Sequence, residues 1–294
     1  MKELFNGAGV ALVTPFKDGQ VNEETLRKLV EWHIEQGTDA LILTGTTGES
    51  ATLSHQEKLD VYRIGVEQAG GRIQIIAGTG SNDTKASIEI SKEAEAMGVD
   101  GLLLVVPAYN KPSQRGLIAH YTAIANAVSI PCILYNVPGR SALDMDPATV
   151  IELSKVPNIA ALKEASGDVG RIARILQESS QGFKVYAGND GEIYDVLALG
   201  GHGVISVLGN ICPAETRAIT KDYWAGDTEK ARAGQQHFDR LIDTLFIETN
   251  PCPVKEAMNL MGLEVGDLRL PLVGLSAENH QALVEVLRDY GLVS

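Results

Sequence analysis

Cysteine and aromatic side chains are scarce in this chain. It has three cysteines among 294 residues, and 5% of its residues are aromatic. The cysteines stand at positions 132, 212 and 252, far apart and without a Cys-x-x-Cys pair. An odd number of widely spaced cysteines argues against a disulfide framework and against a structural zinc site. We therefore expect a reduced protein that needs no bound metal.

Long apolar runs and excess positive charge are also missing. No stretch approaches the ~20 apolar residues of a membrane-spanning helix, and residues 1–7 lack the apolar core of a signal peptide. The formal net charge of −13 argues against nucleic acid and anionic membranes as partners. These features predict a soluble, cytoplasmic protein that acts on small molecules.

Several common catalytic motifs are absent. No two of the six histidines stand three or four positions apart, which disfavours a metal-dependent aldolase with clustered imidazoles. Gly78-Thr79-Gly80 lacks the third glycine of a dinucleotide fingerprint, and there is neither a Walker A sequence nor a Gly-x-Ser-x-Gly elbow. We expect no cofactor.

Apolar runs of strand length alternate with amphipathic stretches of helix length. This alternation is typical of successive βα units with a parallel sheet. Eight such units suit a (β/α)8 barrel of ~250 residues, whereas an open doubly wound sheet usually has fewer strands and a glycine-rich nucleotide turn. The predicted strands are 9–16, 40–45, 74–80, 101–109, 132–138, 159–166, 183–190 and 203–209.

The strand pattern stops near position 227. Residues 229–248, 253–261 and 276–290 have the pattern of helices. We predict a barrel catalytic domain over residues 1–226 and a small helical extension over residues 227–294.

A single lysine, Lys163, lies inside the apolar run 159–166. Burial disfavours the charged ammonium, and a neutral amine is a nucleophile toward carbonyls. Strand alternation puts Lys163 on one face with Ile159 and Ala161, which would be the inside of the barrel. The alternatives are a lysine paired with a buried carboxylate and one that extends to solvent at a strand end.

Other reactive side chains follow the predicted strands, where barrel active sites lie. Tyr135 or Tyr109 could relay protons beside an imine-forming lysine, although strand tyrosines are more often core residues. The Thr46-Thr47 hydroxyls and the backbone amides after them suit a carboxylate, but they also fit an ordinary capped turn. Arg140 could bind a carboxylate or be a surface arginine.

Four segments together carry a family resemblance: 45–50 (GTTGES), 135–140 (YNVPGR), 163–165 (KEA) and 200–207. With them the chain resembles the dihydrodipicolinate synthase / N-acetylneuraminate lyase family over essentially its whole length, and Thr47 with Arg140 favours the synthase branch. The resemblance implies that Lys163 forms a Schiff base with pyruvate. It also implies that Tyr135 relays protons, assisted by Thr46 and by Tyr109, which would reach across a tight dimer interface.

The resemblance further assigns substrate contacts. Thr47 would hold the pyruvate carboxylate, and Arg140 would bind the carboxylate of L-aspartate-4-semialdehyde at the entrance. Gly188 and the carbonyl of Ile205 would help to position substrate. The implied reaction is the committed step toward diaminopimelate and lysine, catalysed by a homotetramer that is a dimer of dimers.

Some members of this family bind L-lysine as an inhibitor at the dimer interface. The sequence departs from that site where Lys58, Ala86 and Ala108 replace a histidine, an acid and an aromatic residue. Lys58 would repel the cationic effector, so we predict weak or absent inhibition by lysine. The positions that fit a regulatory site are Ser50, Ala51, His55 and Asn82.

Two other functions remain open from the sequence. A sister class I aldolase would use the same lysine on a 2-keto-3-deoxy acid or N-acetylneuraminate. Arg140 argues against it, because a polyol aldehyde calls for neutral hydrogen-bonding groups. A non-catalytic barrel that only binds a keto acid would be expected to lack Lys163 or Tyr135, and both are present.

Overall fold

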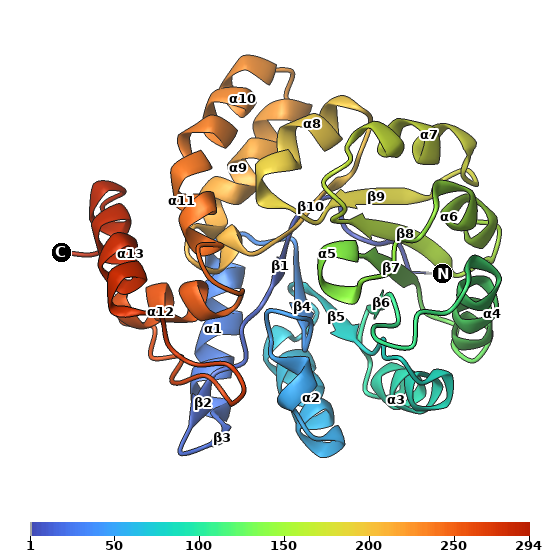
Figure 1. Ribbon diagram of the computed structural model, residues 1–294, viewed down its shortest axis with the longest axis horizontal. Coiled ribbons are helices and arrows are strands. Elements are labelled where there is room, and N and C mark those ends of the chain that lie inside the picture. Colours follow the sequence, from blue (N-terminus) through green and yellow to red (C-terminus); the bar gives the residue numbers. More distant parts are fainter. Residues whose placement is uncertain (1) are drawn as a thin grey trace.

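The computed structural model describes residues 2–294, and within them eight parallel strands form a closed barrel (Figure 1). Their order around the barrel is β1-β10-β9-β8-β7-β6-β5-β4. The prediction of a (β/α)8 barrel is confirmed, and the alternative of an open doubly wound sheet is wrong. The strands are β1 (Gly7–Ala11), β4 (Ala40–Leu43), β5 (Gln74–Gly78), β6 (Gly101–Val105), β7 (Cys132–Asn136), β8 (Ile159–Glu164), β9 (Lys184–Ala187) and β10 (Gly203–Ser206).

Helices surround the barrel, and polar residues start several of them. Ser54 and Glu57 form a reciprocal capping box, and the Asn22 and Asp83 side chains accept hydrogen bonds from backbone amides of the first helical turn. The helices over this part of the chain are α1 (Glu23–Glu35), α2 (His55–Ala69), α3 (Thr84–Ala96), α4 (Gln114–Ala125), α5 (Pro138–Ser141), α6 (Pro147–Leu153), α7 (Gly170–Glu178), α8 (Ile193–Ala198) and α9 (Pro213–Trp224).

Every predicted strand runs beyond the carboxyl end of the observed strand. The predicted strand 9–16 ends at Ala11, and the predicted strand 101–109 ends at Val105. The segments that follow the strands stay apolar and buried, as at Leu12, Val13 and Val106, so hydrophobicity does not mark where pairing stops. The short hairpin of β2 (Phe16–Lys17) and β3 (Gln20–Val21) was not predicted.

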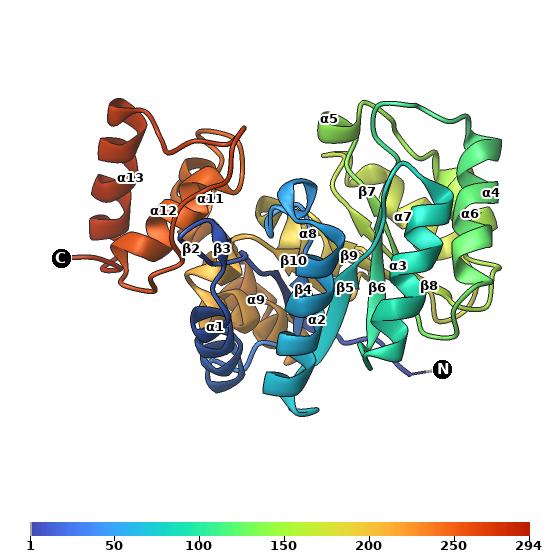
Figure 2. The same cartoon turned by 90° about the horizontal axis from the view of Figure 1, so that it is seen from below.

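The C-terminal residues form four helices, of which α11, α12 and α13 lie together at one end of the molecule (Figure 2). The predicted helix 229–248 is interrupted at Phe238, whose φ of −97° and ψ of 0° leave the helical range while its ring stacks on Tyr290. The division into domains 1–226 and 227–294 stays a prediction. The helices are α10 (Thr228–His237), α11 (Asp239–Leu245), α12 (Cys252–Leu260) and α13 (Ala277–Asp289).

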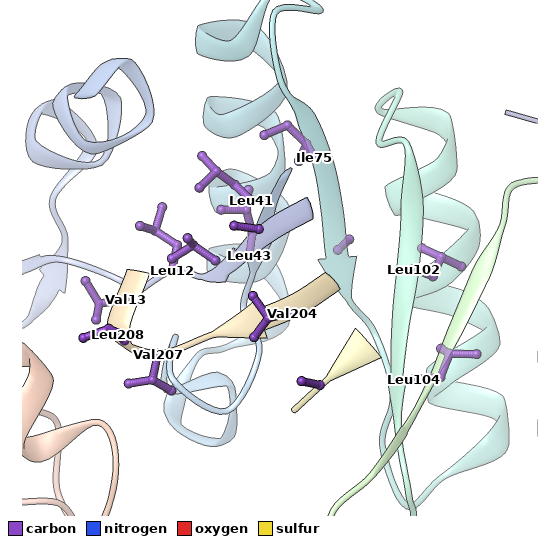
Figure 3. Close-up of a cluster of buried hydrophobic side chains, with 14 of the residues drawn as sticks. Leu12, Val13, Leu41, Leu43, Ile75, Leu102, Leu104, Val204, Val207 and Leu208 are labelled. Atoms are coloured by element: carbon purple, nitrogen blue, oxygen red, sulfur yellow. The ribbon is translucent and has the colours of Figure 1, made fainter. Parts of the chain in front are cut away.

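Two apolar clusters account for the core. The larger lies between the strands and the surrounding helices, and Figure 3 shows part of it around Leu41, Leu43 and Ile75. The smaller consists mainly of inward-facing strand residues, among them Ile133 and Tyr186, and fills the barrel. Among the described residues, no helix combines the length and the apolar character needed to cross a membrane.

Candidate active site

Lys163 lies on β8 between two tyrosine-bearing strands. Its register partners are Tyr135 on β7 and Tyr186 on β9. The lysine is 4% exposed, and burial lowers the pKa of its ammonium to about 8, which Asp190 opposes and Arg140 reinforces. A substantial fraction of the amine is therefore neutral near pH 8, as a nucleophile for a carbonyl carbon requires.

The inward direction of Lys163 depends on a β-bulge. Cys132 pairs with Ile159, but the next residue of β7, Ile133, pairs with Ala161. Ala161 consequently belongs to the cluster inside the barrel, whereas Ile159 packs in the outer cluster with the helices. The prediction that Ile159 shares a face with Lys163 is wrong, because strict alternation cannot anticipate the extra residue.

Tyr135 faces the lysine from the neighbouring strand. The Lys163 Nζ lies 4.4 Å from the centroid of the Tyr135 ring. Burial raises the pKa of the phenol, while Arg140 and a hydrogen bond with Thr46 act in the opposite direction. The tyrosine hydroxyl therefore carries its proton at neutral pH and can donate it to a nearby oxygen.

A cavity of about 60 Å³ lies above the amine. That volume would hold a few water molecules, or a small molecule of a few heavy atoms. A second cavity of about 490 Å³ shares Thr46, Tyr135 and Arg140 with it and extends outward. Of the sequence-predicted site residues, the small cavity is lined by Lys163, Tyr135, Thr46, Thr47, Arg140 and Gly188.

Two predicted residues lie elsewhere. Tyr109 is 93% exposed and has a φ of 72°, so in a single chain its ring contacts neither cavity. Ile205 is buried inside the barrel on β10 and is not part of the cavity wall. Their proposed roles stay predictions.

The residues of the possible regulatory site are only partly together. Ser50 and Asn82 line the larger cavity, and so does Lys58. His55 does not line it; its Nε2 lies 2.7 Å from a carboxylate oxygen of Glu93 on the exposed surface. The wall of the larger cavity therefore includes Ser50, Asn82 and the lysine Lys58, without His55.

The model of the dihydrodipicolinate synthetase family matches residues 4–290. The chain belongs to this family. The 4-hydroxy-tetrahydrodipicolinate synthase of Thermoanaerobacter sp. (strain X514) is 51% identical over 291 residues, which cover 99% of this chain and 98% of that protein.

Solved structures of family members have the same fold. Dihydrodipicolinate synthase from Aquifex aeolicus is 43% identical, with a TM-score of 0.96 over 98% of this chain and 99% of that chain. The enzyme from Cyanidioschyzon merolae, solved with lysine bound, is 41% identical, with a TM-score of 0.96 over 99% of this chain and 100% of that chain.

Asp190 is a buried residue whose charge acts on Lys163, and the sequence assigned no role to it. It follows β9, and its Oδ2 accepts hydrogen bonds from the amides of Val207 at 3.0 Å and Leu208 at 2.9 Å. Its charge favours the ammonium form of Lys163. Its position at the carboxyl end of a barrel strand was the available signal.

Asn250 is a further residue of the cavity walls, and no sequence pattern predicted it. It lines both cavities although it lies between α11 and α12, in the C-terminal part of the chain. Its Nδ2 donates to Thr47 Oγ1 at 2.9 Å, and its carbonyl accepts from Arg140 Nη2, also at 2.9 Å. No local pattern could find a residue whose partner is 203 positions away.

The loop that follows β4 is also tied to the C-terminal helices. Glu49 has a φ of 53° and is fully buried, and its Oε1 lies 2.8 Å from Lys255 Nζ on α12. Lys255 also donates to the carbonyl oxygens of Thr14 and Asp267. All three N–H groups of the Lys255 ammonium therefore have an acceptor, and this ion pair holds in place the loop that carries Thr46 and Thr47.

Proposed function

We propose that this protein is a Schiff-base lyase that condenses pyruvate with L-aspartate-4-semialdehyde to give 4-hydroxy-tetrahydrodipicolinate. The observation that carries the proposal is the buried amine of Lys163, which faces the Tyr135 ring at 4.4 Å beneath a small cavity. The relatives named as 4-hydroxy-tetrahydrodipicolinate synthases support this choice of substrates.

The chemistry begins at the small cavity. The neutral Lys163 amine adds to the ketone carbon of pyruvate, and the carbinolamine loses water to give an imine. Tyr135 and Thr46 supply and accept the protons of these steps. The Thr47 hydroxyl and the backbone amides beside it would hold the carboxylate by donated hydrogen bonds, next to apolar walls formed by Ala11 and Val207.

The second half-reaction uses the larger cavity. Loss of a methyl proton converts the imine to an enamine, whose carbon attacks the aldehyde of the second substrate. The amino group of that substrate then displaces Lys163 as the product cyclises, which frees the enzyme. Arg140 is exposed where the two cavities meet, and its guanidinium would bind the carboxylate of the incoming semialdehyde. A charged partner of this kind favours that substrate over a polyol aldehyde.

We also propose the assembly that the resemblance implies, a homotetramer built from two tight dimers and located in the cytoplasm. The almost fully exposed Tyr109 fits it, since the resemblance places this side chain across a dimer interface and its ring is free to contact a second chain. Sedimentation equilibrium measures the mass directly. A Tyr109→Ala variant should both weaken the dimer and lower activity, and an active monomer would contradict this part of the proposal.

Borohydride reduction in the presence of pyruvate tests the function. We expect a pyruvyl-derived adduct on Lys163 by peptide mass spectrometry. In a separate assay without borohydride, we expect product only when L-aspartate-4-semialdehyde is present together with pyruvate. An adduct with no turnover of this aldehyde would leave the imine mechanism intact and point to another aldehyde. Absence of an adduct on any lysine of the folded protein would exclude lyase chemistry.

A further inference from the structure

Asn250 joins the two groups that would bind the two substrates. Its side-chain amide contacts Thr47, assigned above to the pyruvate carboxylate, and its backbone carbonyl contacts Arg140, assigned to the second carboxylate. The residue is 5% exposed, and its Oδ1 is buried without a hydrogen-bond partner among the described residues. A buried acceptor without a partner lowers the stability of the folded protein. A role of Asn250 in the site therefore explains this geometry better than a contribution to folding does.

The direction of the hydrogen bond to Thr47 matters for chemistry. A threonine hydroxyl has a single hydrogen and two acceptor positions. Because Asn250 Nδ2 donates to Thr47 Oγ1, one acceptor position is occupied and the hydroxyl hydrogen is not used by Asn250. That hydrogen remains free to donate to an anion in the small cavity, which Thr47 lines.

The segment around Asn250 is held rigidly enough for this purpose. Asn250 immediately precedes the α12 region, and five positions later Lys255 forms its buried ion pair with Glu49. Glu49 lies two residues after Thr47 in the chain. The C-terminal segment and the loop after β4 are therefore linked by two contacts, one at the Thr47 hydroxyl and the other at Glu49.

We propose that Asn250 is a positioning residue for the first substrate: it turns the Thr47 hydroxyl hydrogen toward the pyruvate carboxylate. This inference rests on the proposed function. Its backbone carbonyl at the same time holds Arg140 at the junction of the two cavities. One residue outside the barrel strands thus orders both carboxylate-binding groups.

Two substitutions separate this role from packing. Asn250→Ala removes the amide and should raise the pyruvate concentration for half-maximal borohydride trapping about fivefold to tenfold, as for loss of one oriented hydrogen bond. Asn250→Asp keeps the shape but accepts the Thr47 hydrogen and adds a negative charge. It should raise that concentration further, by more than about tenfold. A purely structural role predicts the reverse order, because aspartate preserves the packing.

The second substrate provides an internal reference. Arg140 is held by the backbone carbonyl of Asn250, which Asn250→Ala keeps, so KM of this variant for the semialdehyde should change less than about twofold. Asn126→Ala is the matched control, since Asn126 is exposed at the end of α4. Asn126→Ala should change neither the pyruvate concentration for half-maximal trapping nor KM for the semialdehyde. Thermal unfolding of each variant reports whether it is folded.

A double-mutant cycle removes the remaining dependence on folding. In a Thr47→Val background, Asn250→Ala should add less than about twofold to the pyruvate concentration, because the hydroxyl it orients is gone. Thr47→Ser keeps the hydroxyl and should retain the full effect of Asn250→Ala.

The outcomes are distinct. Trapping by Asn250→Asp at wild-type pyruvate concentrations, or additive effects in the cycle, would overturn the role of Asn250 while leaving the lyase function intact. A wild-type protein that forms no adduct would instead remove the proposed function, and this inference with it.

Discussion

Two buried lysines in this molecule have opposite surroundings. Lys163 and Lys255 are 4% and 1% exposed, and the Nζ of each lies 4.4 Å from the centroid of an aromatic ring. Lys255 donates to three oxygen atoms, one of them from Glu49. No oxygen of residues 2–294 accepts a hydrogen bond from Lys163. Burial lowers the pKa of both ammonium groups, to about 8 at Lys163, whereas at Lys255 the hydrogen bond and charge of Glu49 oppose the shift. Burial alone therefore does not make a lysine reactive, since the absence of partners is also needed.

The two lysines also differ in what holds them. The neighbours of Lys163 lie on the adjacent strands β7 and β9, so the barrel itself supplies its environment. The Lys255 ion pair joins residues 206 positions apart and connects α12 to the loop after β4. In the proposed function the first region would carry out the reaction, and the second holds in place the loop that carries Thr46 and Thr47.

Removing the reactive amine should have the largest effect. Lys163→Met is expected to lower kcat by more than about 10³-fold and to abolish borohydride trapping, because no other group can form the imine. The variant should be at least as stable as the wild type, since an unpaired buried ammonium is replaced by an apolar chain of similar length. Steady-state rates and denaturant unfolding measure both quantities. Retained turnover would place the nucleophile elsewhere.

Removing the phenol should have the next largest effect. Tyr135→Phe is expected to lower kcat by about 10² to 10⁴-fold while the fold is retained, since only the proton-relaying hydroxyl is lost. Tyr121→Phe is the matched control, because the Tyr121 hydroxyl is buried without a partner among the described residues and Tyr121 lines neither cavity. A similar loss in both variants would refute the specific role of Tyr135.

Breaking the ion pair between Lys255 and Glu49 should lower the stability of the protein, whereas removal of the Lys163 amine should not. Lys255→Met leaves Glu49 buried without its cation, and we expect a loss of about 3–5 kcal/mol in the free energy of unfolding. Glu49→Gln in the same chain should recover part of the loss, because the uncompensated charge is removed. Equal stability of Lys255→Met and Lys163→Met in urea unfolding would invalidate the contrast between the two lysines.

The pH dependence of imine formation sharpens the comparison. Only the neutral amine attacks, so the rate of adduct formation should rise with pH, reach half its maximum near pH 8 and level off above it. Asp190 favours the ammonium, and its carboxylate raises the pKa of Lys163 relative to burial alone. Asp190→Asn should therefore move the profile to lower pH. A profile that moves upward, measured by trapping across pH 6 to 10, would show that Asp190 acts in another way.

The smallest expected effect concerns a third lysine. Burial lowers the pKa of Lys58, which lines the larger cavity, and no charged partner contributes to that shift. We expect millimolar L-lysine to change the activity by less than about twofold, because a cation meets another cation there. Lys58→His should increase the sensitivity. Strong inhibition of the wild type by sub-millimolar lysine would refute this prediction, which the lysine-bound relative from Cyanidioschyzon merolae makes worth testing.

The barrel, Lys163 and the motifs after the strands could be predicted from the sequence. The alternation of apolar strands and amphipathic helices repeats locally, and a lysine within an apolar run stands out without reference to any other part of the chain. Tyr135 and Thr47 follow from the rule that barrel sites lie at the carboxyl ends of strands. The strand ends were placed too late because apolar, buried residues such as Leu12, Val13 and Val106 continue beyond the last paired residues.

The partners of these groups were decided only by the tertiary structure. The bulge before Ala161, the bond between Asn250 and Thr47, and the pair of Lys255 with Glu49 each depend on how distant segments meet. A sequence records hydrophobic period and residue type, which are local quantities. Whether a buried lysine finds an acceptor depends on side chains that chain folding brings from two hundred positions away, so the reactive lysine could be suspected from the sequence but not distinguished from a paired one.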